Sequence, residues 1–342
     1  MRRRSFSLLA IYLTPLFCIG CWSGGSKEVV VYSALDSEFA EPVLQSYEKE
    51  HGLTVATKFD VEANKTVGLV ETLIAERARP RCDVFWNNEI LHTLRLEKLG
   101  LLAAYSSPAG ETFPAEFRSP TGTWYGFAAR ARVLLVNTER VAAKDRPGSI
   151  LDLTNEKWRG QCGLAKPLFG TTATHAACLF AAWGPDKAED VFRKVKANDA
   201  KVYAGNKQVA RAVSGGEIMF GLTDTDDALE EVEAGRPVKI IYPDQADGEI
   251  GTLFIPNTVS ILKDCPHPAE ARQLVEYLLS PGVEERLSAG PSAQIPLNPQ
   301  AKVSSRVETP ATVRAMPIDF SAAADQWETA ARFLGGEFAE GK

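Results

Sequence analysis

Short apolar runs rich in β-branched residues alternate along the chain with longer segments of helical periodicity. Residues 29–32 form one such run, and the apolar residues of segment 39–47 that follows recur at helical spacing. In the second half, strands are expected at 161–165, 201–204, 218–222 and 238–242, with helices at 172–183, 208–213 and 227–234. Repeats of strand, helix and strand fold as parallel sheets flanked by helices, so we expect an α/β protein with parallel-rich sheets.

The length of 342 residues is enough for about two domains, each with its own core. Two α/β lobes predict a hinged cleft between them, because ligands of such folds bind beyond the carboxyl ends of the strands. We expect lobe 1 to comprise residues 28–131 and 252–300, and lobe 2 to comprise residues 132–251 and 301–342. The hinge would lie in the crossing strands near 130–136 and 251–254.

The first twenty residues predict export. Three arginines precede an apolar stretch at 8–19, which is too short for a membrane-spanning helix but typical of a signal peptide. The pair Gly20-Cys21 that follows resembles the lipobox of bacterial lipoproteins, in which the cysteine carries lipid. We therefore expect a signal peptide over 1–20, a flexible tether over 21–27 anchored through Cys21, and a location in the periplasm or cell envelope. An ordinary secretory signal cut nearby is the alternative.

The charge of the chain limits its binding partners, and its cysteines raise the question of a disulfide. Lys and Arg number 38 against 44 Asp and Glu, and the basic residues are scattered, which predicts no nucleic-acid partner. In an oxidising compartment a disulfide can form, and we expect Cys162 and Cys178 as the pair. Spacing alone leaves Cys82 and Cys265 open as partners.

Polar loops follow five of the expected strands, where a cleft would collect them. The candidate ligand-binding residues are Ser33, Asp36, Asn88, Glu89, Arg130, Gly170, Thr171, Thr172, Asn206, Thr223 and Thr225. Segment 170–172 opens an apolar helix, so its free N–H groups could bind an anion or could simply be capped. Asp224, Asp226 and Asp227 could cap the next helix, bind a hard cation through oxygen, or pair with an ammonium group. Asp36 and Glu89 would join Asp224 and Asp226 as metal ligands if the lobes close.

Several short motifs, in order from about residue 28 to 300, resemble the bacterial periplasmic ferric-iron-binding proteins, which are type II solute-binding proteins of ABC transporters. The motifs are Val31-Tyr32-Ser33, Asp83-Val84-Phe85-Trp86, Gly100-Leu101-Leu102, Trp124 with Ala129-Arg130-Ala131-Arg132-Val133, Lys157-Trp158-Arg159-Gly160, Tyr203-Ala204-Gly205-Asn206 and Gly216-Glu217. The resemblance implies a two-lobed, hinged receptor of the type II periplasmic binding protein fold. It also implies a permease and an ATPase as partners.

The ligand residues of that family match unevenly. Relatives hold iron through two adjacent tyrosines, where this chain has Thr225-Asp226. A His and a Glu that are common in two other loops are replaced by Asp36 and by Asn88, which is followed by Glu89. The anion side matches better: the loop 169–172 corresponds to the segment that holds a synergistic anion, and Asn206 matches its helper.

No sequence motif of a hydrolase, kinase or His-based metal enzyme stands in a plausible context, so we expect no enzyme and no catalytic cofactor. The sequence therefore predicts a monomeric receptor of an ABC importer, with ferric iron and a synergistic anion as cargo. A small organic solute such as an aminophosphonate is the alternative cargo, and a tethered extracytoplasmic enzyme or sensor domain is the alternative class.

Overall fold

The computed structural model of the chain describes residues 28–60 and 66–338. The expected signal peptide and the tether with Cys21 lie outside the described residues. Within the described part, no helix combines the length and the apolar character that crossing a membrane requires.

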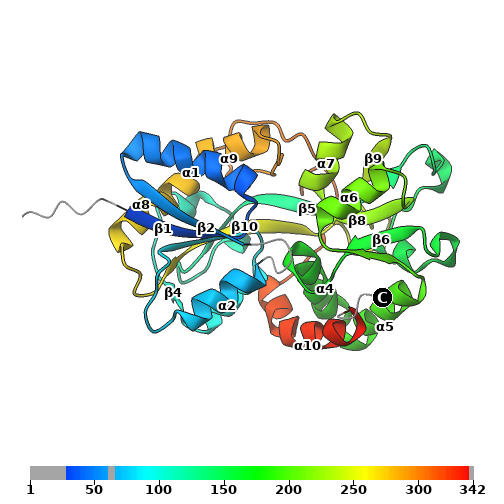
Figure 1. The fold of residues 1–342 in the computed structure, drawn as a ribbon, viewed down its shortest axis with the longest axis horizontal. Helices are drawn as coiled ribbons and strands as arrows, with labels where there is room; N and C mark the ends of the chain where they lie inside the picture. Colours follow the sequence, from blue (N-terminus) through cyan, green and yellow to red (C-terminus); the bar gives the residue numbers. More distant parts are fainter. Residues whose placement is uncertain (1–27, 61–65, 339–342) are drawn as a thin grey trace, which may run out of the picture.

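Ten strands form one sheet in the order β2-β1-β3-β10-β5-β8-β6-β7, with β4 added on β10 and β9 on β5 (Figure 1). The strands are β1 (Glu28–Ser33), β2 (Thr54–Phe59), β3 (Val84–Asn87), β4 (Leu102–Ala103), β5 (Tyr125–Asn137), β6 (Cys162–Ala165), β7 (Lys201–Tyr203), β8 (Phe220–Asp224), β9 (Val238–Ile241) and β10 (Phe254–Leu262). As predicted, β1 pairs in parallel with β2 and β3, and β6 pairs in parallel with β7 and β8. The crossing strands β5 and β10 are antiparallel to their neighbours.

Helices cover both faces of this sheet. They are α1 (Ser37–His51), α2 (Val67–Ala75), α3 (Leu91–Lys98), α4 (Gly170–Trp183), α5 (Pro185–Ala197), α6 (Asn206–Ser214), α7 (Thr225–Glu233), α8 (Pro268–Leu278), α9 (Pro281–Ala289) and α10 (Phe320–Phe338). Figure 1 shows α1 above and α2 below the strands of the first half, and α6 and α7 above the strands of the second half, with α4, α5 and α10 below.

Strand β5 joins the two halves. It pairs with β10 up to Ala131 and with β8 from Arg132 onward, so it changes partner at the residue where we divide the lobes. All thirteen of its residues are buried. The change of partner fits the expected position of the hinge, while the exact division of the chain into lobes stays a prediction.

Helix α4 is buried on all sides through most of its length. Ten consecutive residues, Thr171 to Phe180, are buried, so the helix is covered on all sides rather than on one stripe. Three of these ten residues are alanines, and the helix packs closely against α10, whose Leu334 and Phe338 belong to the same core cluster. This packing holds the first turn of α4 firmly in place, at the edge where the strands of the second half end.

Candidate functional site

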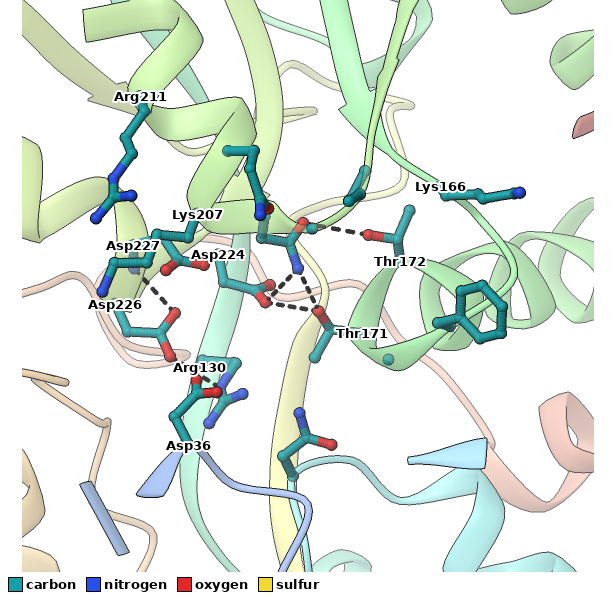
Figure 2. A pocket seen from close by; sticks show the side chains of 18 of the residues that line it. Asp36, Arg130, Lys166, Thr171, Thr172, Lys207, Arg211, Asp224, Asp226 and Asp227 are labelled. Carbon is teal, nitrogen blue, oxygen red and sulfur yellow. Dashed lines mark hydrogen bonds and ion pairs between the residues drawn. The ribbon is translucent and has the colours of Figure 1, made fainter. Parts of the chain in front are cut away.

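A cavity of about 180 Å³ lies between the two halves of the sheet (Figure 2). Four helices begin at it, namely α1, α4, α6 and α7. Its lining includes Asp36, Glu38, Asn88, Arg130, Lys166, Phe169, Gly170, Thr171, Thr172, Asn206, Lys207, Arg211, Asp224, Asp226 and Asp227. The amino end of a helix carries unpaired N–H groups and a partial positive charge, so this convergence favours negatively charged ligand groups.

The first turns of α4 and α6 leave their backbone donors available. Within the described residues, Phe169 and Gly205 are the N-cap residues of these helices, and neither supplies a side-chain cap. Gly170 has a φ of 53°, which glycine adopts without strain and which turns the chain sharply into α4. The predicted anion-binding segment 170–172 therefore lines the cavity, and the first N–H groups of its helix have no side-chain cap.

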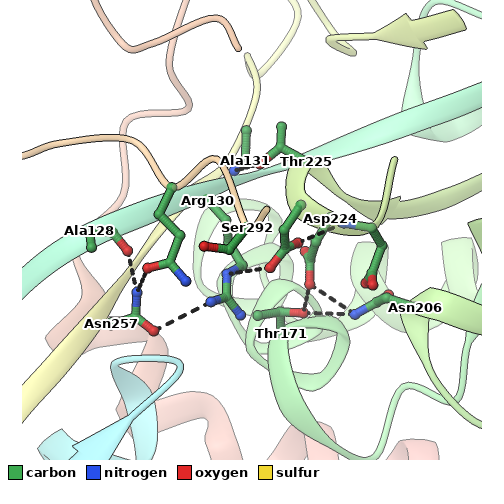
Figure 3. Close-up of polar contacts among 12 residues, drawn as sticks. Ala128, Arg130, Ala131, Thr171, Asn206, Asp224, Thr225, Asn257 and Ser292 are labelled. Carbon is green, nitrogen blue, oxygen red and sulfur yellow. Dashed lines mark hydrogen bonds and ion pairs between the residues drawn. The ribbon is translucent and has the colours of Figure 1, made fainter. Parts of the chain in front are cut away.

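A buried ion pair lies behind these two helix ends. Nη1 of Arg132, a side chain with no exposed surface, donates to Oδ1 of Asp224 at 2.6 Å. The other carboxylate oxygen of Asp224 accepts from the Thr171 hydroxyl at 2.6 Å and from Asn206 Nδ2 at 2.9 Å. Arg132 also donates to Thr172 Oγ1 at 3.1 Å. The carboxylate is thus neutralised and hydrogen-bonded within the protein. Figure 3 shows the contacts among Asp224, Thr171 and Asn206 that fix the α4 end against the α6 end.

The hydroxyl groups of Thr171 and Thr172 both hydrogen-bond within this network, Thr172 donating to Asn206 Oδ1 at 3.2 Å. The first N–H groups of α4, which have no partner within the helix, are the remaining donors of this segment.

A second arginine lies beside a second carboxylate. Nε of Arg130 lies 3.5 Å from Oδ2 of Asp226, and both side chains are at least nine-tenths buried. Burial raises the pKa of the Asp226 carboxyl, and the positive charge of Arg130 opposes this rise. Burial alone would lower the pKa of Arg130, but the charges of Asp226, Asp224 and Asp36 outweigh it, so the arginine pKa rises. Each of these two strand arginines thus lies against a buried carboxylate.

Three carboxylates gather at the start of α7. One oxygen each from Asp224, Asp226 and Asp227 lie within 4.8 Å of one another, a spacing that suits a hard cation. Asp36 lies near Asp226 and Arg130 in the cavity lining (Figure 2). Asp224 forms its ion pair with Arg132, so the carboxylates left to contact a ligand in the cavity are those of Asp36, Asp226 and Asp227.

Four predicted site residues do not line the cavity. Ser33 donates to the Leu35 carbonyl at 3.3 Å, and Thr223 donates to the Asn206 carbonyl at 3.0 Å. Thr225 Oγ1 accepts from the Ala131 amide at 3.1 Å.

Glu89, the fourth, is fully buried at the start of α3, where it accepts from the amides of Leu91 and His92 and from Thr174 Oγ1. Burial raises its pKa. The proposed metal ligands therefore omit Glu89. A side chain that follows a strand can turn back to cap the next helix, and the sequence pattern does not distinguish the two cases.

Sequence reasoning missed two cations. Lys207 and Arg211 stand four residues apart on α6 and both line the cavity. Their spacing puts them on one face of a helix that begins with Asn206, and that signal could have identified them. Lys166 follows β6, whereas Lys207 lies beside α7, where its Nζ is 3.2 Å from Oε2 of Glu230.

Two aromatic residues and a histidine near the cavity belong to the core. Trp86 and Tyr125 lie in one apolar cluster. His175 is buried with Nδ1 unpaired among the described residues, and burial lowers its pKa to about 3. It is therefore neutral and lies outside the cavity lining.

The expected disulfide is wrong. Cys162, Cys178, Cys82 and Cys265 are all free thiols in the structure. Cys162 lies on β6 with its sulfur directed to the Leu153 carbonyl at 3.8 Å, and Cys178 lies inside α4. Both are packed as small apolar residues in one core cluster.

Comparison with known proteins places the chain among solute receptors. A family model described as bacterial extracellular solute-binding protein matches residues 92–323, more than half of the chain. The major ferric iron-binding protein of Neisseria meningitidis is 24% identical over 340 residues, 96% of each chain. Iron-bound HitA from Pseudomonas aeruginosa superposes with a TM-score of 0.81 at 23% identity, covering 90% of this chain and 99% of that one. The periplasmic binding protein AfuA from Actinobacillus pleuropneumoniae, with fructose-6-phosphate bound, gives 0.81 at 24% identity over 92% of this chain and all of that one.

Proposed function

Because the chain belongs to the family of bacterial extracellular solute-binding proteins, we propose that it is the receptor of an ABC importer and hands its cargo to a permease and ATPase pair. The cargo enters the cavity between the two halves and touches both. A ligand that binds the closed arrangement better than the open one shifts the population toward closure. The closed form is then the one that the permease recognises.

The proposed cargo is ferric iron together with an anion. The observation that carries this proposal is the presence of both ligand types in one cavity: carboxylates of Asp36, Asp226 and Asp227 on one side, and the open helix end at Gly170 with Lys166 on the other. Hard cations prefer oxygen ligands, and anions bind at helix amino ends. The iron-binding relatives in Neisseria and Pseudomonas support the same cargo.

A phosphate-bearing organic solute is the second candidate, and a different observation favours it. Arg132 neutralises Asp224 and Arg130 neutralises Asp226. The tyrosine pair that the resemblance implies for iron is replaced by Thr225-Asp226. Carboxylates neutralised in this way attract a ferric ion less, and the guanidinium groups of Arg130 and Arg211 that line the cavity can bind an anionic group without a metal. The fructose-6-phosphate bound to AfuA is consistent with this cargo class.

We propose further that the exported chain acts as a monomer held at the cell envelope by lipid on Cys21. The family assignment supports an extracytoplasmic location. Mass spectrometry of the protein from membranes would detect an acylated cysteine at the amino end. An amino end beginning after a cleavage elsewhere would contradict the anchor.

Thermal denaturation of the chain without its signal peptide distinguishes the two cargoes. Ferric nitrilotriacetate with phosphate should raise the melting temperature by about 4 °C at a hundredfold excess over Kd. Asp226→Asn should lose most of that rise, whereas Asp190→Asn, which removes an exposed carboxylate of α5, should keep it. A rise with fructose 6-phosphate alone, and none with iron, would assign the second cargo.

A further inference from the structure

Besides the buried pair of Arg130 and Asp226, an ion pair at the rim of the cavity joins the first half of the molecule to the second. Nζ of Lys207, in the first turn of α6, lies 3.1 Å from Oε1 of Glu38, in the first turn of α1. The same ammonium lies 3.2 Å from Oε2 of Glu230 on α7. Helix α1 packs on β2 and helices α6 and α7 pack on β8, so the first contact joins the halves and the second stays within one.

This pair lies at the rim of the cavity. Glu38 and Lys207 both line it, and their side chains are 56% and 30% exposed. Burial lowers the pKa of Lys207, but its hydrogen bonds to Glu38 and Glu230 reverse the shift and raise it. Lys207 therefore stays charged across the physiological range, and the contact is open to screening by salt.

Two further polar contacts between the halves involve α3, α4 and α10, on the other side of the sheet. Glu89 of the first half accepts from Thr174 of α4 at 2.9 Å, and Lys98 of α3 forms an ion pair with Asp325 of α10. Figure 1 shows α1 and α6 above the sheet and α4 and α10 below it. The upper side is therefore bridged by Lys207 and Glu38, on a different side of the sheet from those contacts.

We propose that Lys207 and Glu38 form a latch that stabilises the closed arrangement independently of the cargo. The proposal rests on the hinged receptor function given above. An exposed ion pair is weak, and its loss should change the ratio of closed to open molecules by about twofold to fivefold. A bias of this size slows the release of a captured solute without preventing it.

Small-angle X-ray scattering of the ligand-free protein tests the latch directly. Glu38→Gln should enlarge the radius of gyration, and Lys207→Gln should do the same. The matched control is Glu230→Gln, which removes the partner of Lys207 within the same half and should leave the profile unchanged. High salt should open the natural protein but have little further effect on Glu38→Gln.

Ligand affinity separates the latch from a simple ligand-binding role of Lys207. If Lys207 only attracted an anion, removal of the competing Glu38 carboxylate would tighten phosphate binding. The latch predicts that Glu38→Gln weakens phosphate binding about twofold to fivefold, chiefly through faster dissociation.

Tighter phosphate binding by Glu38→Gln, or a scattering profile that neither this substitution nor salt changes, would overturn the proposal. The scattering measurement needs no cargo. A protein that binds neither iron nor fructose 6-phosphate, yet opens on Glu38→Gln, would refute the proposed function and leave the latch standing.

Discussion

Removing either Arg132 or Asp224 alone should destabilise the protein far more than replacing both residues of this buried ion pair together. Arg132→Met leaves a carboxylate in the protein interior with two neutral donors, Thr171 and Asn206. Removing one partner of a buried ion pair costs about 3–5 kcal/mol, and these two donors put the expected cost near the lower end, at about 3 kcal/mol. Asp224→Leu leaves the guanidinium without a countercharge at hydrogen-bonding distance and should cost at least as much.

The double variant should lose only about 2 kcal/mol, much less than the sum of the two single losses, because no charge is then left buried. Urea unfolding followed by tryptophan fluorescence measures all three free energies of unfolding. The control is Arg193→Ala at an exposed pair with Glu189, which should cost less than about 1 kcal/mol. Additive losses, or a loss below about 1 kcal/mol for Arg132→Met, would refute the reasoning.

Burial lowers the pKa of His92 to about 3 in the folded protein, whereas the unfolded chain has a pKa near 6.5 at this residue. The free energy of unfolding therefore decreases as the pH falls below 6.5, because only the unfolded chain takes up the proton. His92→Phe should abolish about 2 kcal/mol of this loss between pH 6.5 and 4.5, as measured by urea unfolding at each pH. An equal loss in the natural protein and the variant would contradict this. Gly251 has a φ of 84°, and a Cβ there would lie 2.8 Å from the Ala315 carbonyl, so calorimetry of Gly251→Ala should show a loss above about 1 kcal/mol. Ellman titration of the unreduced, denatured chain from residue 28 should find four thiols, including Cys162 and Cys178; two would restore the disulfide.

The elements of the fold were predictable because their signals are local. A run such as 29–32 is apolar without alternation, which indicates a strand buried on both faces, and β1 occupies that position. Strand β8 ends later than expected, at Asp224 rather than residue 222, because its last two residues are polar yet still paired with β5. Polar character marks a loop only where the polar groups face water, whereas here the Asp224 carboxylate accepts from Arg132 and the Thr223 hydroxyl donates to the Asn206 carbonyl.

The pairing of charges in the site was not predictable. Arg132 and Asp224 are 92 positions apart, and nothing local indicates that a cleft carboxylate is already neutralised. Glu89 illustrates the opposite error, since a position after a strand predicted a cleft ligand while the backbone turns the side chain into the start of α3. Composition and spacing identify which groups gather at an edge of the sheet. They do not determine which of those groups remain available to a ligand.

Co-retention of iron and phosphate in equilibrium dialysis tests the central claim most directly. The claim is that one cavity binds a cation through Asp226 and its neighbours, and an anion at the start of α4. The account predicts that ferric nitrilotriacetate and phosphate are retained together, in equimolar amounts with the protein, and that omitting phosphate sharply reduces the retained iron. Retention of phosphate at the same level with or without iron, and no retention of iron, would contradict it.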